Sequence, residues 1–344
     1  MGLLVGGMWR DQWYDTSGAG KFKRKDAAFR DWLSADGSNG PNGGKGFKAE
    51  PGRYHLYVSL ACPWAHRTLI TRALKGIGDD LLPVSIVHWR MRENGWEFSP
   101  ANGANEDPFG AATPEPNHGY RYARDLYTHA RPDYTGRVTV PILWDKQEET
   151  IVSNESSEII RMLDTAFDDL GADAGVRLSP PELMDEIEAV NGPIYDEVNN
   201  GVYKAGFATK QDAYEEAFDA LFARLDALEE RLGDQRWLVG DRFTEADVRL
   251  FTTLVRFDAV YFGHFKCNRQ RIADYPALGA YVRDIYQMEA VRPTVDLGHI
   301  KHHYYGSHET INPHLIVPKG PDLDLDAPHD RAHLGPGAPE AIAA

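Results

Sequence analysis

Cys62 ends a short apolar run and is followed directly by Pro63, Trp64 and Ala65. The thiolate is the nucleophilic form of cysteine, and the N-terminus of a helix lowers the pKa of a cysteine placed there. Proline suits the first position of a helix, where no amide hydrogen is needed. The pattern predicts a nucleophilic Cys62 between a strand and a helix; the alternative is a buried cysteine that only fills space.

Ala65 occupies the position at which a dithiol oxidoreductase carries its second cysteine. A mixed disulfide on Cys62 must therefore be resolved by an external thiol, and glutathione is the abundant candidate in a reducing cell. The other cysteine of the chain, Cys267, is expected to be structural. Two cysteines are too few for a disulfide scaffold, so we expect a reducing compartment, the cytoplasm.

Two later segments fit the binding of a peptide-like thiol. Val140 and Pro141 begin a predicted strand, and proline in that place can be cis. In a thioredoxin-like site this turn exposes the backbone of the preceding residue to a peptide ligand. Glu155 and Ser156 open the next helix, where amides and a hydroxyl can hold a carboxylate and Glu155 can pair with an amine. Glutathione carries both groups, although plain helix capping is the alternative.

The elements that must position these residues alternate between strand and helix. Apolar runs predict strands, and an apolar face at helical spacing predicts helices. Residues 90–135 are rich in Gly, Pro and Asn and are predicted to form a long loop. A β-α-β unit followed by β-β-α is the thioredoxin-like arrangement. The predicted strands are 54–60, 81–89, 138–145 and 149–153, and the predicted helices are 63–74 and 155–167.

The chain from residue 180 to residue 300 has the pattern of a helical domain. Apolar residues recur at spacings of three and four from 211 to 232, and Gly233 is predicted to end that helix. Thr244 and Asp247 are spaced as a capping box, and Phe243 and Val248 as the hydrophobic staple that accompanies it.

The predicted architecture is therefore an α/β thioredoxin-like N-terminal domain followed by an all-α C-terminal domain, with an extension at each end. Residues 1–50 are expected to pack in irregular pieces, and the basic run at 21–25 to be a solvated segment. The tail is expected to be extended and to fray beyond residue 325. The predicted domains are 51–170 and 171–304, and the predicted extensions are 1–50 and 305–344.

Charge and hydropathy exclude several classes of partner. The chain has 344 residues and a formal net charge of −15, with 52 acidic and 37 basic residues. Such a field repels polyanions, so neither nucleic acid nor an anionic membrane is an expected partner. The first residues lack the charged region of a secretory signal, and no run reaches the roughly 18 apolar residues of a membrane helix.

Five histidines near the C-terminus have spacings that suggest a metal cluster. No acidic or cysteine ligand close to them in the sequence completes a ligand set, so no metal is expected. The five are His299, His302, His303, His308 and His314.

The chain resembles the glutathionyl-hydroquinone reductases, the xi class of the glutathione transferase superfamily. The resemblance implies a glutathione transferase fold, a homodimer and glutathione as co-substrate. It also implies that Cys62 attacks the sulfur of a glutathionyl-hydroquinone, that free hydroquinone leaves, and that a second glutathione releases oxidised glutathione from Cys62. The stretches that carry the resemblance lie between residue 54 and about 305 and read SLACPWAHR, RVTVPILWD, SNESSEII, NNGVYKAGFA and GDRFTEADVRLFTTLVRFDAVYFGHFKCN.

The same resemblance implies roles for individual residues. Tyr203 matches the proton donor to the leaving ring, and Tyr261 and Tyr304 match tyrosines that hydrogen-bond near the thiol and the hydroquinone hydroxyls. A phenol is a neutral donor that stabilises a thiolate without cancelling its charge. The residues that fall where the family binds glutathione are Trp96, Arg137, Val140, Glu155 and Ser156.

Two other functions remain open. The first is an omega-like cysteine glutathione transferase that exchanges thiols, reduces dehydroascorbate, or cleaves aryl ethers or thioethers; Tyr203, Tyr261 and Tyr304 distinguish the reductase from it. The second is a carrier of aromatic ligands without enzymatic activity. A carrier has no need of an activated thiol, whereas the reductase predicts a Cys62 thiolate well below about pH 8.5.

Overall fold

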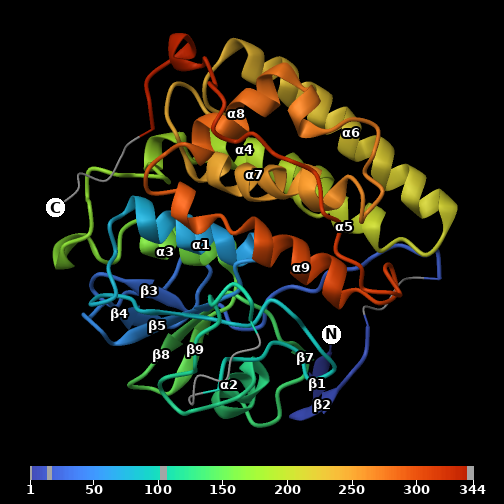
Figure 1. Ribbon diagram of the computed structural model, residues 1–344. Helices are drawn as coiled ribbons and strands as arrows, with labels where there is room; N and C mark the ends of the chain where they lie inside the picture. Colours follow the sequence, from blue (N-terminus) through green and yellow to red (C-terminus); the bar gives the residue numbers. More distant parts are fainter. Residues whose placement is uncertain (1, 14–17, 101–106, 339–344) are drawn as a thin grey trace.

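The computed structural model describes residues 2–13, 18–100 and 107–338, and Figure 1 shows an α/β layer with a helical layer packed against it. The α/β layer contains a four-stranded sheet in the order β6-β5-β8-β9. β6 runs parallel to β5, whereas β8 and β9 are antiparallel to their neighbours. The strands are β5 (Tyr54–Val58), β6 (Val84–Ile86), β8 (Ile142–Asp145) and β9 (Thr150–Ser153).

Helices cover both faces of this sheet, which explains why all five residues of β5 are buried. α1 (Pro63–Leu74) and α3 (Ser156–Leu163) lie on the face toward the helical layer, and α2 (Ala123–Ala130) lies on the opposite face (Figure 1). The predicted thioredoxin-like arrangement is confirmed, and α1 has its predicted bounds.

The prediction of a loop from 90 to 135 is wrong at α2. This helix has only eight residues, and Leu126 and Tyr127 are its large buried side chains, so its apolar periodicity is short. Its first turn is stabilised by the Tyr122 amide, which donates to the Asp125 carboxylate (3.3 Å). α3 is likewise shorter than its predicted span, because the chain leaves the helix at Asp164.

The first 50 residues contain short strands, which corrects the prediction of irregular pieces. β1 (Leu3–Val5) pairs with both β2 (Met8–Arg10) and β7 (Gly136–Arg137), and β3 (Trp32–Ser34) runs parallel to β4 (Gly46–Lys48). The turn between β1 and β2 requires glycine, since Gly7 has φ +76° and a Cβ there would lie 1.9 Å from the Pro132 carbonyl oxygen. The β1–β7 pairing joins residues more than 130 positions apart, so periodicity alone does not indicate it.

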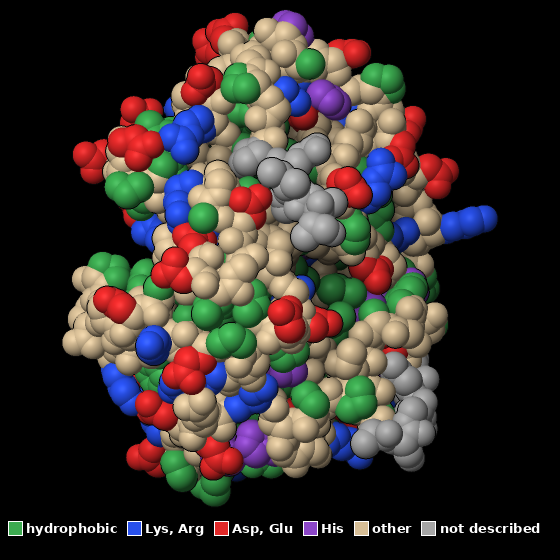
Figure 2. Space-filling model, turned by 90° about the vertical axis from the view of Figure 1, so that its left-hand side faces the viewer, with side chains coloured by type: hydrophobic (Ala, Val, Ile, Leu, Met, Phe, Trp, Pro, Cys, Tyr) green, Lys and Arg blue, Asp and Glu red, His purple; other side chains and the backbone are tan. Residues whose placement is uncertain are grey.

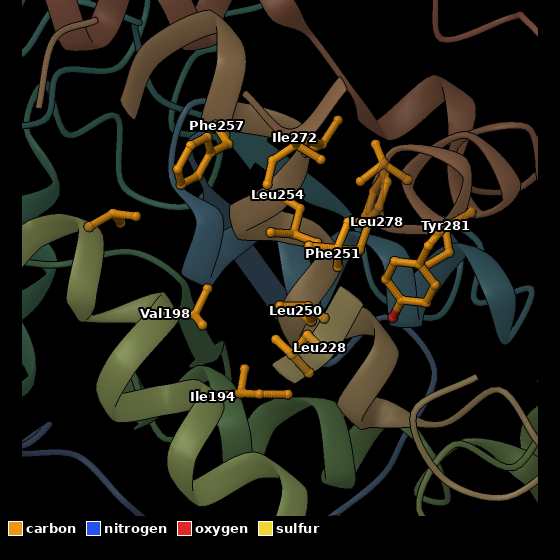
Figure 3. Close-up of a cluster of buried hydrophobic side chains, with 14 of the residues drawn as sticks. Ile194, Val198, Leu228, Leu250, Phe251, Leu254, Phe257, Ile272, Leu278 and Tyr281 are labelled. Carbon is orange, nitrogen blue, oxygen red and sulfur yellow. The ribbon is translucent and has the colours of Figure 1, made fainter. Parts of the chain in front are cut away.

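The helical layer surrounds the core cluster drawn in Figure 3. Leu228 of α6, Leu250 and Leu254 of α7 and Leu278 of α8 point toward one another in that view. Two π-helical turns, η3 and η4, continue α4 and α7. The elements are α4 (Met184–Pro193), η3 (Ile194–Asn199), α5 (Gly201–Gly206), α6 (Gln211–Asp234), α7 (Glu245–Arg256), η4 (Phe257–Tyr261), α8 (Pro276–Tyr286) and α9 (Leu297–Ser307).

The predicted capping box of α7 is confirmed. The Thr244 amide donates to the Asp247 carboxylate (2.9 Å), and the Thr244 hydroxyl accepts from the Ala246 amide (3.3 Å). The predicted end of α6 is wrong by a short distance, because the helix continues through Gly233 to Asp234.

The C-terminal tail is held against the helical layer as far as the structure describes it, so the prediction of fraying beyond residue 325 is wrong up to residue 338. The buried Arg331 guanidinium donates to the carbonyls of Leu232 (2.8 Å), Gln235 (2.9 Å) and Arg236 (2.9 Å). The Trp237 indole donates to the Pro336 carbonyl (2.9 Å). Residues 339–344 of the predicted tail lie outside the described residues.

Acidic and basic side chains are interspersed on the face shown in Figure 2. Within the described ranges, none of the helices combines the length and the apolar character needed to span a bilayer.

Candidate active site

Cys62 lies at the junction of β5 and α1, as its sequence context predicts. It is the N-cap of α1, with φ −76° and ψ 120°, and Pro63 is the first helical residue. Its Sγ lies 3.5 Å from the carbonyl oxygen of Val140, which precedes a cis peptide bond to Pro141. The thiol therefore faces the turn that the sequence predicts to expose backbone to a peptide ligand.

A pocket between the two layers surrounds this thiol. It brings together side chains from α1, the N-terminal segment, the β7–β8 turn, the start of α3, α5 and α9. Tyr261 is fully buried and reaches this pocket through its hydrogen bond to Tyr304. The predicted site residues that line the pocket are Cys62, Trp96, Arg137, Val140, Glu155, Ser156, Tyr203 and Tyr304.

The electrostatics of Cys62 differ from the expectation. Although the side chain reaches the pocket, protein atoms surround the thiol densely, and this burial raises the pKa of Cys62. The amides of Ala65 and Trp64 and the guanidinium groups of Arg256 and Arg24 act in the opposite direction. In the protein without ligand, desolvation outweighs these groups and the pKa is raised, contrary to the prediction of a thiolate well below about pH 8.5.

Arg256 is a site residue that the sequence did not indicate. It ends α7, where its spacing alone makes it one more helical residue, and it is fully buried. Its guanidinium donates to the carbonyls of Leu60 and Ala61 (2.9 Å each), directly before Cys62. The helical layer thereby holds the Cys62 loop and adds a positive charge near the thiol.

Arg24 is the second such residue, and it corrects the prediction that 21–25 is a solvated segment. Its guanidinium lies 4.5 Å from the ring centre of Trp64 and 5.3 Å from that of Tyr203. Its Nε donates to the Asn200 side chain (2.9 Å). Phe22, in the same segment, is buried. The single apolar residue of KFKRK, Phe22, is a weak signal that this segment packs on the protein.

Three tyrosines form a chain of hydroxyl groups beside the thiol. The hydroxyl of Tyr304 lies 2.5 Å from that of Tyr203 and 3.0 Å from that of Tyr261. They come from α9, α5 and η4. Burial raises the pKa of all three phenols above its ordinary value, so all three are neutral donors at physiological pH.

Trp96 and Arg137 lie at the side of the pocket formed by the N-terminal domain. Trp96 is buried and stacks on His303 of α9, with ring centres 4.9 Å apart and planes at 22°. Arg137 donates to the backbone carbonyls of Gln12 (2.5 Å) and Trp13 (2.6 Å). Arg137 therefore fixes the N-terminal segment at the pocket.

Glu155 and Ser156 occupy the N-terminus of α3. The Glu155 carboxylate accepts from the amide (2.9 Å) and the hydroxyl (2.8 Å) of Ser157, so it caps the helix. The Ser156 hydroxyl lies 3.5 Å from the Arg67 guanidinium. Both residues also line the pocket, so capping does not remove them from the site.

Three of the five C-terminal histidines, His299, His303 and His308, are held by partners within the protein. His299 lies 3.0 Å from the Asp107 carboxylate. The two residues are 192 positions apart in the sequence, so spacing along the chain does not predict this contact. His303 bonds to the Trp89 carbonyl (2.8 Å), and His308 to His264 (3.1 Å).

The sequence of this chain is similar to those of glutathione transferases. Models of the glutathione S-transferase N-terminal and C-terminal domains match residues 61–166 and 211–284. Glutathionyl-hydroquinone reductase YqjG of Escherichia coli is 57% identical over 332 residues, which cover 96% of this chain and 98% of that protein.

Solved structures give the same relationship. The glutathione-bound structure of YqjG superposes with a TM-score of 0.86 at 53% identity, covering 96% of this chain and 99% of that chain. A xi-class glutathione transferase from Natrialba magadii superposes with a TM-score of 0.86 at 48% identity, covering 97% and 98%. The chain therefore belongs to the xi class of glutathione transferases, the family that includes the glutathionyl-hydroquinone reductases.

Proposed function

We propose that this protein reduces glutathionyl-hydroquinones to free hydroquinones with glutathione as co-substrate. The Cys62 thiolate attacks the sulfur of the conjugate, a sulfur–sulfur bond forms and the bond from sulfur to the aryl carbon breaks. The aryl carbon takes up a proton and leaves as hydroquinone. A second glutathione, as thiolate, attacks the Cys62–glutathione disulfide, so that oxidised glutathione leaves and the Cys62 thiolate is regenerated.

One observation carries this proposal: Cys62 faces a pocket that also contains a buried phenol chain, and the resolving position holds the buried Ala65. A thiol without an internal partner requires an external one. The phenols supply neutral donors at a place where a departing aryl carbanion needs a proton.

In this proposal Tyr203 donates the proton to the leaving ring. Its hydroxyl lies at one end of the hydrogen-bonded series of three hydroxyl groups, and its side chain lines the pocket. Tyr304 and Tyr261 donate toward the hydroquinone hydroxyls and the thiolate. After proton transfer, the 2.5 Å contact lets the Tyr304 hydroxyl donate to the Tyr203 oxygen.

Glutathione is proposed to bind between the Val140 turn and the start of α3. The Val140 backbone is placed to pair with the cysteinyl part of glutathione. The amides at the start of α3, the Ser156 hydroxyl and the Glu155 carboxylate suit the γ-glutamyl carboxylate and amine. Trp96 and Arg137 are proposed to border the other end of the molecule.

The two alternatives make different use of the same pocket. An omega-like transferase needs Cys62 but not the three phenols. A carrier needs neither an accessible thiol nor the charges of Arg24 and Arg256 near it. The phenol chain favours the reductase over both.

The direct experiment mixes the protein with a glutathionyl-hydroquinone and excess glutathione, and measures free hydroquinone and oxidised glutathione. We expect equal yields of both products, abolished by Cys62→Ala and retained by Cys267→Ala, since Cys267 is buried and does not line the pocket. Absence of turnover with glutathione still bound would reject the reductase in favour of another thiol-transfer substrate or a carrier.

We also propose that the protein acts as a homodimer in the cytoplasm. Both cysteines are free thiols in the structure, which suits a reducing compartment. The family resemblance supports the dimer. Light scattering coupled to gel filtration would give twice the mass of one chain, whereas the mass of one chain would reject the dimer.

A further inference from the structure

A second group of chemically active side chains lies on the opposite face of the sheet from α1 and α3. His118 precedes α2, His129 lies in the last turn of α2, and Glu149 lies in the turn between β8 and β9. Figure 1 shows α2 and the ends of β8 and β9 on the side away from the helical layer. The residues that line the Cys62 pocket do not include any of these three.

The ligand atoms of these three side chains lie close together. Nε2 of His118 lies 3.8 Å from Oε1 of Glu149, and Nε2 of His129 lies 3.6 Å from Oε2 of the same carboxylate. One ligand atom from each residue lies within 4.8 Å of the others. Zinc binds histidine nitrogen and carboxylate oxygen at about 2.0–2.2 Å, so ligand atoms of a tetrahedral ion lie about 3.3–3.5 Å apart. The two measured distances end on different oxygens of the Glu149 carboxylate and exceed this spacing by a few tenths of an ångström. Taking one ligand atom per residue, the widest spacing is within 4.8 Å, so the side chains need to close around an ion by at most roughly 1.5 Å.

Neighbouring groups orient the ring of His129. Its Nδ1 lies 2.7 Å from the Tyr120 hydroxyl, whose oxygen can accept the Nδ1 proton and leave the Nε2 lone pair facing Glu149. A hydrogen bond on the far nitrogen is the usual way in which proteins set the tautomer of a metal-binding histidine.

His118 is oriented by a buried carboxylate. Its Nδ1 is buried and has no hydrogen-bond partner among the described residues, but it lies 3.8 Å from Oε2 of Glu115. Glu115 is itself fixed by the Tyr57 hydroxyl (2.5 Å) and the His118 amide (2.7 Å). With an ion on Nε2, the hydrogen of His118 would lie on Nδ1 and face this carboxylate, as in other metal sites in which a carboxylate supports a histidine ligand.

Packing holds both rings while leaving the site open to solvent. The Trp144 ring contacts His118 and His129 edge-on, with ring centres 5.4 and 5.6 Å apart. The side chains of His118, His129 and Glu149 are 15%, 26% and 59% exposed. An ion can therefore enter from solvent, and water can complete its coordination.

We propose that His118, His129 and Glu149 bind one divalent transition-metal ion of the zinc class. Two neutral imidazoles and one carboxylate are the donor set that such ions accept. The ion would link the C-terminal end of α2 to the β8–β9 turn and so stabilise the outer face of the sheet. It takes no part in the glutathione chemistry, for which no metal is expected.

The test uses the untagged full-length chain, stripped of metal, in a Cys62→Ser background so that the thiol cannot compete for the ion. Titration with Zn²⁺ by calorimetry, and with Co²⁺ by visible absorption, should give one site per chain. Co²⁺ should show the absorption of a four- or five-coordinate ion. Zn²⁺ should also raise the unfolding temperature of this protein.

Matched variants separate this site from other metal contacts. His129→Ala and Glu149→Gln should each weaken Zn²⁺ binding by more than about a hundredfold, and Tyr120→Phe by about tenfold, because a ligand contributes more than its supporting group. His333→Ala and Glu148→Gln remove an exposed histidine and the neighbouring glutamate, and should leave the affinity unchanged.

Unfolding temperatures measured in chelator show whether each variant folds before any metal is added. Equal Zn²⁺ affinity in the ligand variants and the control variants would overturn the proposal. So would absence of a single strong site in the starting protein, which would leave the three residues as an ion-pair cluster only.

Discussion

The hydroxyl of Tyr203 lies 2.5 Å from the hydroxyl of Tyr304, although the two residues are 101 positions apart in the chain. One of the two must donate to the other. Because Tyr304 also contacts the Tyr261 hydroxyl at 3.0 Å, the three groups share their protons as one network. Replacing one of the three tyrosines should therefore change which hydrogen bonds the other two hydroxyl groups can donate.

Tyr203→Phe should slow the release of hydroquinone from its glutathione conjugate by about 10²- to 10⁴-fold, the range of a general acid. Exchange between glutathione and a simple glutathione mixed disulfide should be nearly unchanged, because a thiolate leaving group needs no proton. Rates of both reactions under single turnover test this. Tyr305→Phe, which changes the residue that follows Tyr304 in α9, is the control and should retain both rates. Equal loss of both reactions in Tyr203→Phe would contradict the role of proton donor.

Arg24→Gln should raise the pKa of Cys62, because the guanidinium is one of the two positive charges that lower it. The rate of thiol alkylation by iodoacetamide should therefore rise at higher pH than in the unchanged protein, and the rate at neutral pH should fall. Lys23→Gln, which removes an exposed charge from the same segment, is the control. Identical pH profiles for Arg24→Gln and the unchanged protein would show that Arg24 has no influence on the thiol.

Stability should fall as the pH is lowered from 7 to 5. Burial lowers the pKa of His264 to about 3 and that of His303 to about 4, and it lowers the pKa of His308 well below its ordinary value. Between these values and the unfolded pKa of about 6.5, the unfolded chain binds protons that the native protein does not, so stability rises with pH in this range. Each such histidine lowers the free energy of unfolding at pH 5 by up to about 2 kcal/mol relative to its value at pH 7.

The pH dependence of stability should depend most clearly on the His264–His308 pair. The two ring nitrogens lie 3.1 Å apart and share one proton, so a second proton between them would be repelled by the first. Urea unfolding of His308→Gln at pH 7 and pH 5 should show a smaller loss of stability than the unchanged protein. His333→Gln, at an exposed position, should leave the loss unchanged. Asp247 opposes this trend, because burial raises the pKa of its carboxyl to about 6. A pH-independent stability between 5 and 7 in the unchanged protein would contradict the prediction.

Arg331→Gln should destabilise the protein by about 3 kcal/mol, as expected for a buried charge that loses its partners. The guanidinium is 3% exposed and satisfies carbonyls at the end of α6 as well as lying 3.7 Å from Asp284. Arg283→Gln, whose guanidinium makes one longer contact to the Pro328 carbonyl (3.3 Å), is the matched control and should change stability little. Equal unfolding midpoints for the two variants would show that the tail is not an integral part of the fold.

Local patterns determined much of this protein. The apolar run before Cys62 and the proline after it place the thiol at the start of α1. The spacing of Thr244 and Asp247 predicts the start of α7, because a capping box depends only on residues within one turn. Family motifs indicated the three tyrosines and the pocket residues, and the structure brings them around one pocket or its hydroxyl chain.

Only the tertiary structure decided the environment of those residues. Arg24 and Arg256 act on the Cys62 thiol from an N-terminal segment and from the end of a distant helix, so the residues around them in the sequence do not indicate this effect. The pKa of the Cys62 thiol depends on how much protein surrounds it, and desolvation outweighs the helix terminus that the sequence suggests. Contacts between residues far apart in the chain follow from packing, whereas capping and helix starts follow from neighbours in sequence.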